Sequence, residues 1–340
     1  MSACSTPKLR SSRLQYRPLG LSGVKVSALA LGCMTFGREI DELPALELIE
    51  RYLEVGGNFI DTADVYSAGR SEEIVGKAIK KCRDDIVLAT KVRFPMGSGP
   101  NDQGLSRKHL IRGLEASLRR LNTDYIDLYQ VHGWDANAPL EETLSALSSL
   151  VGQGKVRYIG ASNFAGWQLV KALSISESRG FEKFVSVQLQ YSLVERSIEY
   201  EIVPACQEIG IGIIPWGPLG QGFLSGKYRR DQLPPEGSRL ATAEPDWEEH
   251  WSRRATEVNW HILDAVQSIA GETGRSASQV ALNWLLHQPA VSAVSVGARS
   301  TAQLDENLGA VGWELTEEQL GRLDVVSRPR RMYPYPNQRL

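Results

Sequence analysis

Four polar residues that can carry acid–base chemistry follow short apolar segments of the sequence. Asp61, Tyr66, Lys91 and His132 each lie at, or just after, the end of such a segment. Strands that are buried on both faces are nearly continuous in apolar residues, so these polar ends call for an explanation. Because the carboxyl ends of the strands of a parallel barrel meet at one face, we expect the four side chains to converge there.

This set of residue types can donate a proton to a carbonyl group. A tyrosine hydroxyl, with an ordinary pKa of about 10, is a poor acid at neutral pH. The Lys91 ammonium would lower the pKa of Tyr66 by stabilising the phenolate, and the Asp61 carboxylate would hold Lys91 charged and in place. His132 can donate a hydrogen bond that aligns the carbonyl oxygen. Since no side chain supplies a hydride, carbonyl reduction by this set requires a nicotinamide cofactor.

Each residue also has an interpretation without chemistry. Asp61 could cap a loop, Lys91 could reach solvent from a strand end, and His132 could be a core histidine with satisfied hydrogen bonds. Four such coincidences at neighbouring strand ends favour a common site instead. The hypothesis is therefore a catalytic set of Asp61, Tyr66, Lys91 and His132.

The elements that must position these residues alternate regularly along the chain. Eight short runs rich in β-branched and aromatic residues are predicted as strands, and about eight amphipathic segments between them as helices. This alternation predicts an α/β fold, a closed parallel (β/α)8 TIM barrel. The predicted strands are 26–32, 58–63, 85–92, 125–132, 156–163, 184–191, 210–217 and 291–298.

Two additions to a bare barrel are predicted. The segment 14–27 should form an N-terminal β-hairpin that turns at residues 21–23. An extended loop, 222–275, separates the seventh strand from its helix. No shift in composition marks a second domain. We expect a disordered N-terminus at 1–13, a single barrel domain at 14–327, and a C-terminal tail at 328–340 that could lie over the barrel mouth.

A doubly wound Rossmann fold is the main alternative architecture. Its phosphate-binding turn requires G-x-G-x-x-G after the first strand, and this motif does not occur in the chain. The motifs G-x-x-x-x-G-K-[S/T], H-E-x-x-H and G-x-S-x-G are absent as well. The barrel is therefore the favoured architecture.

Composition excludes several classes of partner. The chain has 340 residues, with 38 Lys and Arg against 40 Asp and Glu. This balance lacks the single-sign field typical of proteins that bind nucleic acid or an anionic membrane surface. No apolar run approaches the roughly 20 residues that span a bilayer. The four cysteines are scattered without a C-x-x-C pair, which argues against a zinc site or a disulfide framework. We expect a cytoplasmic protein without metal, nucleic acid or membrane partners.

Beyond these patterns, the chain resembles the aldo-keto reductase superfamily from about residue 15 to about residue 327, with order and spacing kept. The resemblance implies Tyr66 as general acid/base, Lys91 and Asp61 as the pair that tunes it, and His132 as the residue that orients the substrate carbonyl. All four positions hold the expected residue types. The segments that carry the resemblance are GCMTFG (32–37), NFIDTADVYSAGRSEEIVGKAI (58–79), LATK (88–91), DYIDLYQVHGWD (124–135), IGASNF (159–164), VQLQYS (187–192) and VSVGARSTAQLDENL (294–308).

The resemblance also implies a cofactor site. Ser162, Asn163 and Gln188 match positions that bind the nicotinamide carboxamide, and Trp216 matches an aromatic ring against the nicotinamide face. The loop after Trp216, with Lys227, resembles a segment that folds over the pyrophosphate. The predicted cofactor-binding residues are Thr35, Asp61, Ser162, Asn163, Gln188, Trp216, Gly217, Pro218, Leu219, Gly220, Gly222, Lys227, Gly297, Arg299, Gln303, Glu306 and Asn307.

Arg299 and Ser300 follow the last predicted strand and precede a predicted helix. A phosphate near a helix N-terminus with an arginine beside it is favoured electrostatically. The family places a basic residue on the 2′-phosphate here, and some members carry Lys-Ser. A surface arginine near a helix cap is the alternative. We therefore expect NADPH over NADH.

Substrate choice is expected to depend on loops around the barrel mouth. Phe36, Phe94 and Trp134 are predicted to line the substrate pocket with Tyr66 and His132. Residues 222–250 of the long insertion and the segment 330–340 are further candidates, since a Tyr-Pro-Tyr-Pro pattern in this last segment favours an extended conformation. A disordered basic tail is the alternative. Aromatic and apolar walls suggest an uncharged carbonyl compound of moderate size.

The prediction is NADPH-dependent reduction of an aldehyde or ketone, reversible as an alcohol oxidation. The first alternative is a nicotinamide-bound regulatory subunit like the potassium-channel β subunits that share this fold. Against it, the chain shows no long N-terminal inactivation segment and no evident partner surface. A barrel lyase or isomerase is disfavoured because the metal or phosphate chemistry typical of such enzymes is not evident. Family members occur as monomers and as larger assemblies, so an oligomer stays open.

Overall fold

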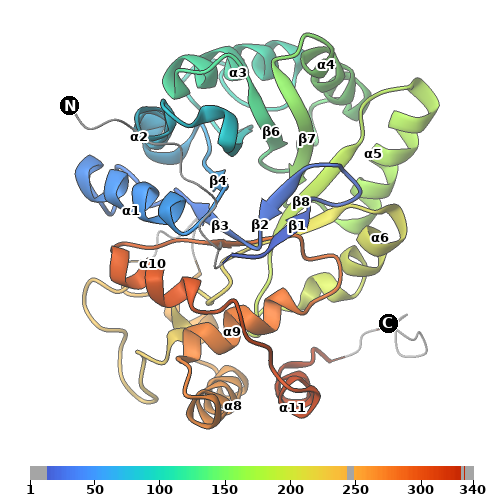
Figure 1. The fold of residues 1–340 in the computed structure, drawn as a ribbon. Coiled ribbons are helices and arrows are strands. Elements are labelled where there is room, and N and C mark those ends of the chain that lie inside the picture. The colour runs from blue at the N-terminus through green and yellow to red at the C-terminus, as the bar shows by residue number, and fades with distance from the viewer. Residues whose placement is uncertain (1–13, 243–248, 331–332, 334–340) are drawn as a thin grey trace.

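The computed structural model describes residues 14–242, 249–330 and 333. The predicted N-terminal segment 1–13 lies outside these residues, and so does most of the predicted tail 328–340. The described chain forms one parallel β-barrel surrounded by helices, with a short antiparallel hairpin across one end (Figure 1).

Eight parallel strands form the barrel, which confirms the predicted (β/α)8 fold. Each lies within or close to a predicted apolar run and follows the chain order around the sheet. The last edge is closed by hydrogen bonds from Ile213 N to Ala290 O (2.7 Å) and from Ser292 N to Ile213 O (2.9 Å). The strands are β3 (Leu29–Gly32), β4 (Phe59–Asp61), β5 (Val87–Val92), β6 (Ile126–Val131), β7 (Val156–Ser162), β8 (Phe184–Gln190), β9 (Gly212–Trp216) and β10 (Val294–Val296).

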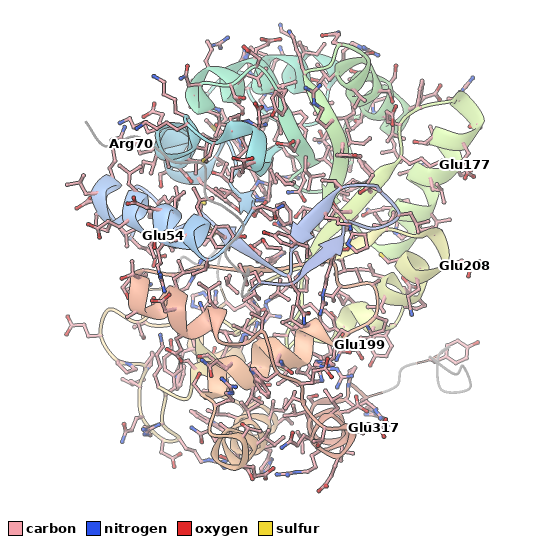
Figure 2. All side chains as sticks on the ribbon, in the orientation of Figure 1. Glu54, Arg70, Glu177, Glu199, Glu208 and Glu317 are labelled. Carbon is pink, nitrogen blue, oxygen red and sulfur yellow. The ribbon has the colours of Figure 1, made fainter. Side chains whose placement is uncertain are left out.

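Amphipathic helices cover the outside of the barrel. In the first of them, Leu48, Ile49 and Tyr52 are buried at the spacing of one helical face. Charged residues such as Glu177 and Glu317 lie at the periphery (Figure 2). The barrel helices are α1 (Glu42–Glu54), α2 (Arg70–Ile79), α3 (Arg107–Leu121), α4 (Leu140–Gly152), α5 (Gly166–Arg179), α6 (Ile202–Ile209), α9 (Ala277–Leu286) and α10 (Thr301–Leu308).

The predicted hairpin is present and plugs one end of the barrel. Its strands, β1 (Tyr16–Pro18) and β2 (Lys25–Ser27), pair antiparallel. Leu19 in the turn is fully buried in the cluster of residues inside the barrel. Gly20 has φ +57°, and a side chain there would come within 2.4 Å of the Val185 carbonyl. Because this end is filled, the carboxyl ends of the strands form the open end.

The predicted insertion contains helices that were not predicted. The chain forms α7 (Trp251–Arg254) and α8 (Glu257–Thr273) before α9, and α11 (Glu317–Ser327) packs against α8. The ring of Phe223, near the start of the insertion, lies 4.8 Å from the ring of Trp260 on α8. Aromatic contacts of this kind anchor the insertion on a helical base. None of the described helices combines the length and apolarity needed to cross a membrane.

Candidate active site

Lys91 and Asp61 form a buried ion pair at the carboxyl ends of β5 and β4. Lys91 Nζ lies 2.7 Å from Asp61 Oδ2 and also donates to Thr62 O at 2.8 Å. Gln130 Nε2 donates to the other Asp61 oxygen at 3.1 Å. Burial lowers the pKa of Lys91, but the Asp61 charge and the interaction with Tyr66 more than offset it, so the pKa is raised. Lys91 is therefore an ammonium ion at neutral pH.

The Tyr66 hydroxyl accepts a long hydrogen bond of 3.4 Å from Lys91 Nζ. Burial raises the pKa of Tyr66, the Lys91 charge lowers it and the Asp61 carboxylate raises it, and the net shift is upward. The expectation of a lowered pKa is therefore wrong for this site, because burial outweighs the lysine. Tyr66 is protonated at neutral pH, as a proton donor must be. Lys91 lies where it can stabilise the phenolate after the proton leaves.

Tyr66 begins a turn whose backbone is strained. Ser67 and Ala68 have φ values of 49° and 52°, in the left-handed region. Each costs a non-glycine residue about 1 kcal/mol or more. Ser67 Oγ donates to Phe36 O at 2.8 Å, which helps to hold the turn against the loop after β3. Strain of this kind concentrates at functional sites, where the surrounding structure imposes one conformation.

His132 follows β6 and faces Tyr66. Their ring centroids are 5.7 Å apart, and the Phe94 ring lies 4.8 Å from His132 on another side. Burial, followed by the charges of Lys91 and Arg93, lowers the pKa of His132 well below its usual value. His132 Nδ1 has no hydrogen-bond partner among the described residues. A neutral imidazole in this position can donate a hydrogen bond to a carbonyl oxygen but is not itself an acid.

A second polar group lies beside this one, at the ends of β7, β8 and β9. Asn163 Nδ2 donates to Ser162 Oγ at 3.0 Å and to His132 O at 3.1 Å, and its Oδ1 accepts from Trp216 Nε1 at 3.1 Å. The buried Gln188 Nε2 finds no partner within the described part of the chain. A buried donor without a partner costs about 1–3 kcal/mol, so Gln188 offers an open donor to a ligand.

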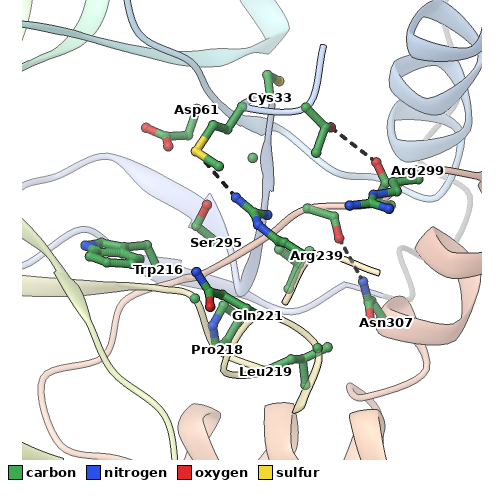
Figure 3. Close-up of a pocket in the computed structure, with 18 of the residues that line it drawn as sticks. Cys33, Asp61, Trp216, Pro218, Leu219, Gln221, Arg239, Ser295, Arg299 and Asn307 are labelled. Carbon is green, nitrogen blue, oxygen red and sulfur yellow. Dashed lines mark hydrogen bonds between the residues drawn. The ribbon is translucent and has the colours of Figure 1, made fainter. Parts of the chain in front are cut away.

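These groups line one cavity of about 660 Å³ at the open end of the barrel. This volume is in the range of small-molecule sites, about 300–1,000 Å³. Figure 3 shows Asp61 and Trp216 towards one side and Arg299 and Asn307 towards the other. The predicted site residues that line the cavity are Thr35, Asp61, Tyr66, Phe94, His132, Ser162, Asn163, Gln188, Trp216, Gly217, Pro218, Leu219, Gly222, Lys227, Gly297, Arg299, Gln303, Glu306 and Asn307.

Four predicted site residues do not line the cavity. Lys91 is fully buried and reaches the site only through Asp61 and Tyr66, and Gly220 lies within the loop after β9 but outside the lining. Phe36 is fully buried in the hydrophobic core. Trp134 packs outside the cavity, with its ring 5.4 Å from that of Trp167. Phe36 and Trp134 are therefore not part of the cavity wall, because their side chains pack against other residues instead.

Positive charge gathers around one part of the cavity. Lys227, Arg239 and Arg299 line it, and burial together with the charges of Arg299 and Arg239 lowers the pKa of Lys227. Arg239 was not predicted, since it lies in the long insertion where no periodicity or motif marks it. Its guanidinium contacts Met34 Sδ at 3.7 Å (Figure 3). The other lining residues that were not predicted are Gly32, Cys33, Met34, Gln221, Ser225, Ser278, Ser295, Val296 and Ala298.

Some of these omissions had a signal in the sequence. Cys33 and Met34 lie in the segment 32–37, which carries part of the family resemblance, and Val296 and Ala298 flank the predicted Gly297.

Within the described ranges, no group of three His, Cys, Asp or Glu side chains could hold a metal ion.

The barrel and its polar cavity agree with the comparison to known proteins. Residues 28–328 match the model of the aldo/keto reductase family, and the chain belongs to this family. It is 39% identical to the uncharacterized oxidoreductase YrpG of Bacillus subtilis (strain 168), over 92% of this chain and 96% of that protein. It is 35% identical to versiconal hemiacetal acetate reductase of Aspergillus parasiticus, over 94% and 99% of the two chains. A probable voltage-gated potassium channel subunit beta of Oryza sativa subsp. japonica is 36% identical, over 95% and 100%.

Proposed function

We propose that this protein reduces an uncharged aldehyde or ketone to the alcohol with NADPH, in a reversible reaction. The observation that carries the proposal is the Tyr66 hydroxyl, 3.4 Å from the Lys91 ammonium and beside the His132 ring on the wall of the cavity. Family membership supports it, as do relatives named as an oxidoreductase and a reductase.

The residues around the cavity fit a dinucleotide with an added phosphate. Near Tyr66, the unpaired Gln188 Nε2 suits a carboxamide oxygen, and Ser162 and Asn163 supply further polar atoms. Trp216 offers an aromatic face on the same side of the cavity. When bound, the reduced nicotinamide supplies the hydride.

The other part of the cavity suits the phosphates. Lys227, Arg239 and Arg299 line this part of the cavity as hydrogen-bond donors, and arginine binds phosphate bidentately. We assign the 2′-phosphate to Arg299, and the adenosine end to Gln303, Glu306 and Asn307 on α10. The loop that begins at Gly217 would cover the pyrophosphate.

The side chains of the protein supply and direct the proton. Neutral His132 donates a hydrogen bond to the carbonyl oxygen and aligns it towards Tyr66. As negative charge develops on this oxygen, Tyr66 transfers its hydroxyl proton to it. Lys91 stabilises the resulting phenolate, and Asp61 holds Lys91 charged. In the direction of alcohol oxidation, the phenolate accepts the proton instead.

The substrate class follows from the wall beside Tyr66. Phe94 and Trp216 are aromatic, and the three cations of the lining, Lys227, Arg239 and Arg299, are assigned to the cofactor. No other lysine or arginine lines the described cavity to pair with a substrate anion. We therefore propose an uncharged carbonyl compound of moderate size as the substrate. We also propose that the reaction takes place in the cytoplasm.

Nucleotide titration followed by a carbonyl panel tests this proposal. The purified protein is titrated with NADPH and NADH while tryptophan emission is followed, and aldehydes and ketones are then added to the NADPH complex. Tighter binding of NADPH and carbonyl-dependent loss of reduced-nicotinamide absorbance are the expected results. Failure to bind either nucleotide would overturn the proposal.

A channel-associated regulatory subunit is the second candidate. Relatives from Oryza sativa and Arabidopsis thaliana that match 95% of this chain are each named a probable voltage-gated potassium channel subunit beta. Such a protein would bind the nucleotide tightly with little turnover. Binding of NADPH without turnover across the whole panel would favour this second candidate over the reductase.

A further inference from the structure

Glu39 forms an ion pair with Arg299, one of the three cations that line the cavity. Arg299 Nε contacts Glu39 Oε2, while Glu39 Oε1 lies 2.5 Å from Arg38 Nη2. The Glu39 side chain is only 15% exposed, against 35% for Arg299. Glu39 Oε2 is buried, and its contact with Arg299 lacks the geometry of a hydrogen bond. The pairing is therefore mainly electrostatic, and a better acceptor can replace the carboxylate.

The backbone holds Glu39 in this position. Thr35 O accepts the backbone N–H groups of Glu39 at 2.9 Å and Ile40 at 3.2 Å. Thr35 Oγ1 donates to the carbonyl of Ala298, the residue before Arg299, at 3.4 Å. The loop after β3 is thus joined to the segment after β10. Because the loop is fixed, the carboxylate reaches the guanidinium without ordering a long mobile segment.

Five charges interact in this region. Burial, Arg299 and Arg239 lower the pKa of Lys227, whereas Glu39 raises it. With Arg38, which pairs with the other carboxylate oxygen, four positive charges therefore surround the negative charge of Glu39. Carboxylate and phosphate oxygens use the same guanidinium donors, so the Glu39 carboxylate and a ligand phosphate compete for Arg299.

We propose that Glu39 is a specificity-determining residue of the cofactor site: its carboxylate pairs with Arg299 in place of a 2′-phosphate, so NADPH must displace it and NADH need not. This inference rests on the proposed use of a nicotinamide dinucleotide. Glu39 lowers the preference for the phosphorylated cofactor below what the three cations alone would produce. Removal of its charge therefore increases discrimination against NADH.

Two matched variants separate this effect from a general change of charge. Glu39→Gln removes the negative charge and keeps the shape of the side chain. Glu42→Gln makes the same change three residues later, at a side chain that pairs with Arg70 and with Lys77 (2.7 Å) on α2 and does not line the cavity. Both variants raise the net charge of the chain by one.

Adenosine 2′,5′-bisphosphate and adenosine 5′-monophosphate are the probes, because they differ only in the 2′-phosphate. Their affinities are measured by calorimetric titration at fixed ionic strength. We expect Glu39→Gln to increase the affinity for the bisphosphate roughly fivefold to tenfold, which corresponds to the energy of a partly buried ion pair. The affinity for the monophosphate should be unchanged. Glu42→Gln should match the parent with both probes. In an Arg299→Ala background, the effect of Glu39→Gln should disappear.

Three results would overturn the inference. In the first, Glu39→Gln binds the bisphosphate no more tightly than the parent does. In the second, it gains the same affinity for both probes, and in the third, only its affinity for the monophosphate changes, by falling. A purely structural ion pair between the two loops would lower thermal stability without changing the ratio of the two affinities. The proposed function fails separately, if the parent protein binds neither NADPH nor the bisphosphate.

Discussion

Lys91 Nζ and Asp61 Oδ2 lie 2.7 Å apart, and their side chains are 0% and 4% exposed. The removal of two charges from water is expensive, and their mutual attraction compensates only when the geometry is good. Here Thr62 O and Gln130 Nε2 supply the additional hydrogen bonds. The pair therefore holds an ammonium ion next to Tyr66, at a depth where an unpaired lysine would lose its proton.

Asp61→Asn should destabilise the protein strongly, because it leaves the Lys91 ammonium buried without a counter-ion. We expect the free energy of unfolding to fall by about 3 kcal/mol or more, measured by urea denaturation. Addition of Lys91→Met should restore part of the loss. Glu115→Gln, which breaks the more exposed pair with Lys155, is the control and should cost less than about 1 kcal/mol. Equal urea midpoints for Asp61→Asn and the parent would contradict this account of the pair.

Tyr66→Phe should abolish most turnover and leave cofactor affinity unchanged. The variant keeps the ring against His132 but removes the hydroxyl proton, so we expect kcat for carbonyl reduction to fall about 100-fold or more. Steady-state kinetics and nucleotide titration together measure the two effects. Tyr125→Phe removes a hydroxyl that bonds Asp84 on the outside of the barrel and serves as the control. A Tyr66→Phe enzyme as fast as the parent would remove Tyr66 from the role of acid.

The pH dependence of reduction should identify the acid. The pKa of Tyr66 is raised from its ordinary value of 10, so its proton is present throughout the neutral range. The pKa of His132 is well below 6.5, so the imidazole stays neutral there. We therefore expect kcat/KM to be nearly constant from about pH 6.5 to about pH 9. A tenfold fall per pH unit above 6.5 would instead indicate protonated His132 as the acid.

Asp64 should make the protein less stable as the pH rises. It is buried, and neither carboxylate oxygen has a hydrogen-bond partner within the described residues. Burial and the nearby Glu72 raise the pKa of Asp64 to about 8. In the unfolded chain this carboxyl loses its proton near pH 4, while the folded chain keeps it until about pH 8. Between these limits the unfolded state binds fewer protons, so stability falls by up to about 1.4 kcal/mol per pH unit.

Asp64→Asn keeps the shape of this side chain but does not titrate. We expect the variant to lose less stability than the parent between pH 5 and pH 8, as measured by urea denaturation at both values. Asp124→Asn, at an exposed side chain, is the control. Parallel pH dependences for the parent and Asp64→Asn would show that Asp64 is ionised in the folded protein.

Most of the fold and the centre of the site could be predicted because they depend on local patterns and topology. Asp61, Lys91 and His132 follow or end runs of buried residues, and such runs favour strands whatever surrounds them. Eight parallel strands bring their carboxyl ends to one face, so these residues meet without any detailed knowledge of packing. The closed barrel and the hairpin across its other end could be inferred for the same reason.

The misplaced Phe36 and the missed Glu39 and Arg239 lie on loops. Phe36 was expected in the cavity wall and is buried, while Glu39, three residues later, reaches Arg299. The backbone N–H of Phe36 donates to Cys33 O and that of Glu39 donates to Thr35 O, and no periodicity records such contacts. Arg239 enters the cavity from an insertion without a motif. The pattern of strands and helices therefore determined which groups meet at the barrel mouth. Only the tertiary structure decided the conformations of the loops and the direction of the Tyr66 pKa shift, because both depend on contacts and burial between residues far apart in the chain.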